Sequence, residues 1–139
     1  MSDEAMFEVF GEQHREYQAE AEQTWGNTDA WATSAKRTAH YTKADWEEFK
    51  AESAAIMNRI ADVYRSGAAP DSNEAMDAVD AHRLQIDRRF YDCPPELHIQ
   101  LGEGYVADPR FTATYEAIAP GLTVWVRDAI NANAQRVVI

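Results

Sequence analysis

Apolar residues recur along this chain at the spacing of α-helices, and no stretch shows the strict alternation of a β-strand. The clearest helical pattern follows Thr42 and Asp45, which resemble a capping box, and it stops at Gly67. The side chains that share one stripe between these points are Phe49, Ser53, Ile56, Ile60, Val63 and Tyr64. We therefore expect a long amphipathic helix in the middle of the chain.

The C-terminal half contains four more helical patterns. The first of them has a stripe formed by Met76, Val79, Arg83, Ile86 and Phe90. Prolines mark later boundaries, because the residue before a proline is pushed out of the α conformation while proline fits the first turn of a helix. We expect the first of these helices to be capped by Asp71 or Ser72 and to end near Tyr91. A second helix is expected over residues 95–107. A short helix capped by Asp108, with Pro109 in its first position, and a last helix from Pro120 follow.

The N-terminal half is more polar. Residues 3–23 are rich in Glu, Gln and Ala, are interrupted by Gly11, and carry little apolar surface to bury. A second helix is expected from Thr28 or Asp29 to about His40. Such segments have helix propensity but are marginal until something covers them. Together the patterns predict an all-α fold class, a compact bundle of about seven helices.

Composition fits one globular domain over residues 1–139. The chain has a mass of 15.7 kDa and is 45% hydrophobic and 27% charged. No apolar run approaches the ~18 residues that span a bilayer, and the acidic start lacks the pattern of a secretory signal. Cys93 is the single cysteine, which excludes an internal disulfide. We expect a cytoplasmic protein that does not act on a membrane.

The charge argues against a nucleic-acid partner. Thirteen basic and 24 acidic side chains give a net charge of −11, which repels phosphates. No P-loop, dinucleotide-binding loop or nucleophile elbow is present, so we expect no enzyme. The four histidines lack the spacing of a metal site: His14, His40, His82 and His98. We therefore expect no metal and no other cofactor, and a haem or small-gas binder is a minor alternative.

Cys93 has the most specific chemical argument. It lies just ahead of an expected helix, whose positive N-terminal end would stabilise a thiolate. Asp92 and Glu96 work against that effect. An inert, buried cysteine is the alternative, and it is common among cysteines of globular proteins.

Aromatic residues crowd the polar N-terminal half. They are Trp25, Trp31, Tyr41 and Trp46. This half is too polar to build a core of its own, whereas Trp125 in the last helix is expected to pack in one. We infer that the N-terminal rings close over an apolar ligand and that residues 1–45 form a flexible part ordered by it.

Six motifs, spread in order over nearly the whole chain, resemble the TipAS antibiotic-recognition domain family. They are residues 25–31 (WGNTDAW), 38–46 (TAHYTKADW), 90–93 (FYDC), 98–111 (HIQLGEGYVADPRF), 119–122 (APGL) and 127–133 (RDAINAN). The family comprises the effector-binding part of MerR-type transcription activators. The resemblance implies a globin-like helical arrangement without haem.

The resemblance also implies a function. Members bind large apolar peptide antibiotics of the thiopeptide or albicidin class, and in the thiopeptide binder a cysteine at the position of Cys93 adds to a dehydroalanine of the drug. We therefore expect a binder that sequesters such antibiotics as a monomer or weak dimer. The expected ligand-binding residues are Trp25, Trp31, Tyr41, Trp46, His82, Phe90, Tyr91, Asp92, Cys93, His98, Leu101 and Tyr105, with Cys93 as the candidate for covalent attachment.

This chain departs from the family pattern in three places. The MerR DNA-binding half does not precede the recognition domain in these 139 residues, so an effector domain separated from that half is the alternative function. The second departure is the pair Pro94 and Pro95, which directly follow Cys93. Gly104 stands where a larger side chain is usual, and we expect the gap to enlarge the binding pocket.

Overall fold

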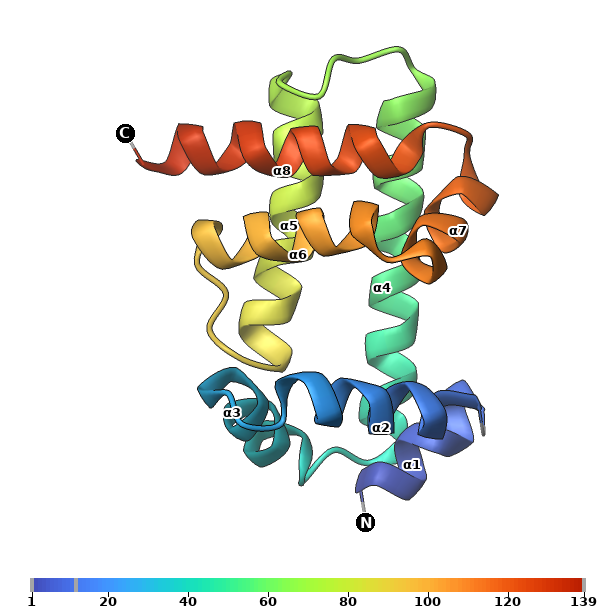
Figure 1. The fold of residues 1–139 in the computed structure, drawn as a ribbon. Helices are drawn as coiled ribbons and strands as arrows, with labels where there is room; N and C mark the ends of the chain where they lie inside the picture. The colour runs from blue at the N-terminus through green and yellow to red at the C-terminus, as the bar shows by residue number, and fades with distance from the viewer. Residues whose placement is uncertain (1, 12, 139) are drawn as a thin grey trace. The chain divides into compact units, whose positions relative to one another are not determined.

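Helices make up nearly all of this computed structural model, which describes residues 2–11 and 13–138 (Figure 1). That part of the chain contains eight α-helices and no strand, so the predicted all-α class is confirmed. The helices are α1 (Ser2–Phe10), α2 (Gln13–Trp25), α3 (Asp29–Thr38), α4 (Lys43–Arg65), α5 (Asn73–Arg89), α6 (Pro95–Ala107), α7 (Pro109–Ile118) and α8 (Leu122–Val138).

Local capping explains where several helices start. Thr42 and Asp45 form the predicted capping box: the amide of Thr42 donates to Asp45 Oδ2 at 2.9 Å, and the amide of Asp45 donates to Thr42 Oγ1 at 3.2 Å. Thr28 accepts from the amide of Trp31 at the start of α3. Of the two caps predicted for α5, Ser72 is the one that accepts an amide bond. Asp108 caps α7 as predicted.

The count of helices and the last boundary differ from the prediction. Eight helices replace the expected seven because Gly11, at φ +93°, separates α1 from α2 in a conformation that other residues rarely adopt. The last helix begins at Leu122 rather than Pro120. Gly121 turns the chain there at φ +86°, and Glu116 accepts from its amide at 2.8 Å.

The chain divides into two compact units. The first comprises Met1–Ser53 and Gln85–Asp92, and the second comprises Ala54–Leu84 and Cys93–Ile139. Helices α4 and α5 are each divided between the two units.

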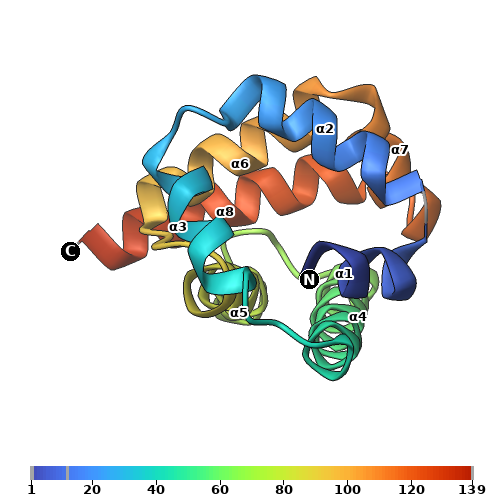
Figure 2. The ribbon, with the colours of Figure 1, turned by 90° about the horizontal axis from the view of Figure 1, so that it is seen from below.

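The second unit contains the larger apolar core. Helices α6 and α8 lie side by side, with α7 connecting them at one end (Figures 1 and 2). Gly102 permits this close approach, because a Cβ atom there would lie 3.2 Å from Ile130 Cδ1. Trp125 packs in this core as expected, and its Nε1 donates to the Ala68 carbonyl. Its other buried members include Ile60, Val79, Leu122, Val126, Ala129 and Ile130.

The first unit has a smaller core. Met6 and Trp46 are its buried members, and the partly buried residues around them are Ala5, Val9, Phe10, Tyr41, Phe49 and Phe90. Within residues 2–11 and 13–138, no helix is both long enough and apolar enough to cross a membrane.

Candidate functional site

Trp46 is the centre of a cluster of aromatic rings in the first unit. Its ring centroid lies 5.2 Å from Tyr41, 6.1 Å from Phe10 and 6.0 Å from Phe49, in edge-to-face geometries. Phe90 stacks at a tilt, 6.2 Å away. Trp46 is only 3% exposed, and its indole N–H has no hydrogen-bond acceptor. The cluster is therefore a packed set of rings that contains one buried donor without a partner.

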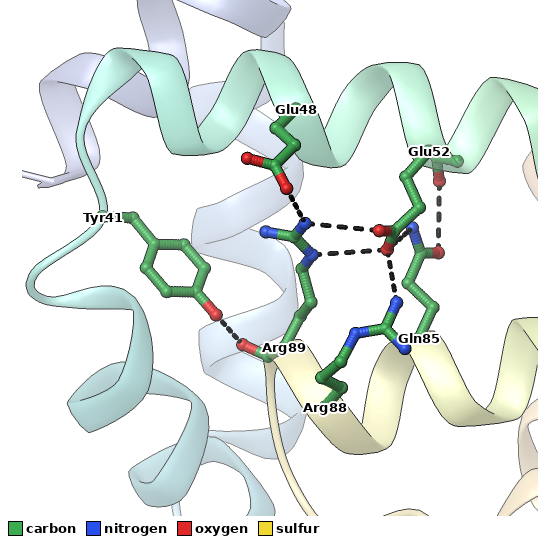
Figure 3. Close-up of polar contacts among 7 residues, drawn as sticks. Tyr41, Glu48, Glu52, Gln85, Arg88 and Arg89 are labelled. Atoms are coloured by element: carbon green, nitrogen blue, oxygen red, sulfur yellow. Dashed lines mark hydrogen bonds and ion pairs between the residues drawn. The ribbon is translucent and has the colours of Figure 1, made fainter.

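Glu52 holds α4 to α5 beside this cluster (Figure 3). It accepts from Gln85 Nε2 at 3.0 Å, from Arg88 at 2.8 Å and from Arg89 at 3.3 Å, and Glu48 also accepts from Arg89. Burial alone would raise the pKa of Glu52, but the bonds from Arg89, Gln85 and Arg88 outweigh it and lower that pKa. The network fixes the end of α5, which Phe90 directly follows.

Sequence reasoning did not identify the role of Glu52. The available signal was two glutamates four residues apart on a helix face, with an arginine pair at 88 and 89 to match them. Nothing in the spacing along the chain indicates that these two faces meet, because that depends on how α4 and α5 pack.

Hydrogen bonds within the first unit hold the last turn of α5 and the residues that follow it. The Tyr41 hydroxyl donates to the Arg89 carbonyl, and burial raises the pKa of Tyr41. Arg37 donates to the Asp87 carbonyl and to Asp92 Oδ1, the latter at 3.0 Å. Tyr91 is half-buried. The structure thus brings Tyr41, Trp46 and Phe90 together as ring contacts, with Tyr91 and Asp92 following directly in sequence.

Trp25 and Trp31 lie outside the Trp46 cluster as far as the described residues show. Trp25 is 58% exposed at the end of α2, and Trp31 is half-buried in α3. No described side chain of α2 is buried, and α3 has none either. These two helices therefore have apolar ring surface available to another molecule.

His82 and His98 form a neutral pair in the second unit. His82 Nδ1 and His98 Nε2 are 3.1 Å apart, and the Tyr105 ring lies 6.2 Å from that of His82. Burial lowers the pKa of His82 to about 4. Burial, followed by the charges of His82 and Arg83, lowers the pKa of His98 to about 3. Both rings are therefore uncharged at neutral pH.

Cys93 is completely buried in the same unit. Its carbonyl accepts from Arg83 Nη1 at 2.9 Å. Leu101 is half-buried on α6, and Gly104 is exposed, with open space where a Cβ atom would lie.

A metal centre has no support in the described part of the chain. No group of three or more His, Cys, Asp or Glu side chains there could hold a metal ion. The side chain of His14 lies outside the described residues.

Comparison with known sequences identifies relatives. A model of the TipAS antibiotic-recognition domain matches residues 17–133. The HTH-type transcriptional activator TipA of Streptomyces coelicolor is 44% identical over 137 residues, which are 98% of this chain and 54% of that protein. The HTH-type transcriptional activator mta of Bacillus subtilis is 37% identical over 86% of this chain and 46% of its own length. The chain thus spans about half the length of these relatives.

Two solved structures are similar to this one. TipAS from Streptomyces lividans in complex with nosiheptide matches with a TM-score of 0.85 and 45% identity, over 96% of this chain and 94% of that one. The antibiotic-binding domain of a TipA-class multidrug resistance transcriptional regulator matches with a TM-score of 0.61 and 42% identity, over 68% of this chain and all of that one. These matches confirm the predicted family resemblance and the globin-like helical bundle.

Proposed function

Because this chain belongs to the TipAS antibiotic-recognition domain family, we propose that it binds large apolar peptide antibiotics and lowers their unbound concentration. The likeness at 45% identity to a domain solved with nosiheptide, over 96% of this chain, carries the proposal. Nosiheptide is therefore the first ligand to test. Binding proceeds without turnover, so the protein acts as a trap rather than an enzyme.

The proposed binding residues fall in both units. Those of the first unit are Trp25, Trp31, Tyr41, Trp46, Phe90, Tyr91 and Asp92, and those of the second are His82, Cys93, His98, Leu101 and Tyr105. The exposed ring of Trp25 and the unused indole donor of Trp46 support the first group.

Cys93 is the proposed attachment point for an antibiotic that carries a dehydroalanine. The thiol gives its proton to water, and the thiolate sulfur forms a bond to the β-carbon of the double bond. The π electrons move to the α-carbon, which takes a proton from water, so no oxidant is needed. Binding holds the two groups together and makes the addition fast.

An effector domain of a transcriptional regulator is the second candidate. It is favoured because the similar proteins TipA and mta are HTH-type activators of about twice the matched length. An in-frame helix-turn-helix encoded ahead of residue 1 would support it. In both cases this chain supplies the antibiotic-binding step, and we propose that it does so in the cytoplasm as a monomer or weak dimer.

Isothermal titration calorimetry with nosiheptide tests the proposal. We expect saturable binding of one molecule per chain. Trp25→Ala removes an exposed ring and should weaken binding by about tenfold, the effect of losing one large apolar contact. Val124→Ala removes exposed apolar surface from α8 and should leave affinity unchanged. The absence of binding up to the solubility limit of the drug would contradict the proposal.

A further inference from the structure

The thiol assigned to antibiotic attachment is enclosed in protein. Cys93 has no exposed surface, and the two residues that follow it, Pro94 and Pro95, have no amide hydrogen with which to hold this segment in place. The segment must therefore move before the sulfur can meet an electrophile. What restrains that movement decides when Cys93 reacts.

A chain of hydrogen bonds ends on the backbone of Cys93. Arg83 Nη1 on α5 donates to the Cys93 carbonyl at 2.9 Å, and Arg83 Nε donates to Asp80 Oδ1 at 2.7 Å. Asn133 Nδ2 on α8 donates to the same Asp80 oxygen at 2.9 Å, and Arg136 donates to Asn133 Oδ1 at 2.7 Å. Two helices thus fix the guanidinium that holds this carbonyl.

The surroundings of Arg83 make this bond a strong one. The Arg83 side chain is only 14% exposed and that of Asp80 21% exposed, so water competes weakly for their hydrogen bonds. Burial raises the pKa of Asp80, but the bonds from Arg83 and Asn133 outweigh it and lower that pKa, which keeps the carboxylate ionised. Hydrogen bonds from charged donors are stronger than those between neutral groups.

We propose that Arg83 is a positioning residue: its hydrogen bond to the Cys93 carbonyl keeps the thiol inside the protein until that bond breaks. We call this contact the latch. The inference rests on the proposed function for the identity of the electrophile, but the latch itself needs no antibiotic. Small electrophiles bring no binding energy to offset the opening and react slowly. A large antibiotic contributes binding energy that favours the open segment, which makes Cys93 selective for it.

The rate at which Cys93 reacts with dithiodipyridine tests the latch in the whole folded chain. This reagent forms a mixed disulfide and releases a coloured thione, and the signal reports Cys93 alone because the chain has one cysteine. Arg83→Met should raise the rate about tenfold or more, the effect of losing a charge-assisted hydrogen bond. The double variant Arg83→Met, Asp80→Asn avoids leaving a partly buried carboxylate unpaired and should show the same rise.

Arg65→Met is the matched control. Arg65 Nη2 donates to the Ile118 carbonyl at 2.8 Å, the same kind of bond elsewhere in the same unit. Its loss should change the rate of Cys93 modification by less than about twofold.

Urea distinguishes a latch from general destabilisation. Opening of one segment exposes little surface, so the modification rate of the Arg83 variants should rise only weakly with urea below the unfolding transition. An unchanged rate in both variants, or a rise with the full urea dependence of global unfolding, would overturn the proposal. Calorimetry with nosiheptide on the same proteins tests the proposed function separately, because the thiol reagent reads the latch without the drug.

Discussion

At the scale of single residues, the pair formed by the half-buried His82 and the buried His98 makes stability depend on pH. The folded protein keeps His82 and His98 neutral down to a pKa of about 4 and about 3, whereas the unfolded chain takes up protons near the ordinary value of 6.5. Between these values the unfolded state binds more protons, so stability rises with pH and falls as pH is lowered.

Lowering the pH from 7 to 5 should therefore destabilise the protein. We expect a loss of roughly 2 kcal/mol per histidine in the free energy of unfolding, measured by urea denaturation at each pH. The double variant His82→Asn, His98→Asn should have a much flatter profile over this range. Equal slopes for the variant and the original protein would show that other groups control the pH dependence.

The histidine pair also shows the limit of sequence reasoning at this scale. The spacing of the four histidines argues against a metal site, but it does not show that His82 and His98 meet. Their mutual bond of 3.1 Å depends on the packing of α5 against α6, and helical spacing carries no information about that. For the same reason the sequence left open whether Cys93 is reactive or inert and buried, and the structure shows that it is completely buried.

At the scale of elements, Glu52 accepts most of the side-chain hydrogen bonds that α5 donates to α4 within the described part of the first unit. Its carboxylate accepts from three side chains of α5, whereas Glu48, one turn earlier, accepts a single bond at 3.3 Å with a side chain that is 70% exposed. Removing the charge of Glu52 leaves Arg88 without its carboxylate partner and leaves Arg89 with Glu48 alone. Removing the charge of Glu48 costs little because water replaces it.

Glu52→Gln should lower the free energy of unfolding by about 1–2 kcal/mol, and Glu48→Gln by less than about 0.5 kcal/mol. Urea denaturation at neutral pH measures both. The lowered pKa of Glu52 means that its contribution is present above its ordinary value of 4.5 and is lost as pH falls below it, so the two variants should converge in acid. Equal losses of unfolding free energy in the two variants at neutral pH would contradict the proposed role of Glu52 in joining α4 to α5.

Helix boundaries were the most predictable part of the elements. The capping box at Thr42 and Asp45, the stop at Gly67 and the proline starts of α6 and α7 depend on local chemistry, which the sequence contains in full. The predicted start of α8 is two residues early, because the carboxylate of Glu116 accepts from the Gly121 amide and holds a turn before the helix. That contact joins residues five positions apart, and the spacing of apolar residues does not indicate it.

At the scale of the whole molecule, apolar contacts are distributed unevenly along the chain. Helix α8 supplies many of the buried residues of the second unit, whereas α2 and α3 bury no described side chain. Polar composition predicted this weakness of the N-terminal half. A helix without buried contacts is held mainly by its own hydrogen bonds and opens readily.

Hydrogen exchange followed by mass spectrometry should reveal this difference and its response to a ligand. Without a drug, amides of α2 and α3 should exchange within seconds to minutes, while those of α8 stay protected far longer. With saturating nosiheptide, α2 and α3 should become protected, because an apolar guest supplies the contacts that these helices lack. Protection of α2 and α3 equal to that of α8 before any drug is added would show that the N-terminal half is stable by itself, and binding would then have to occur without ordering it.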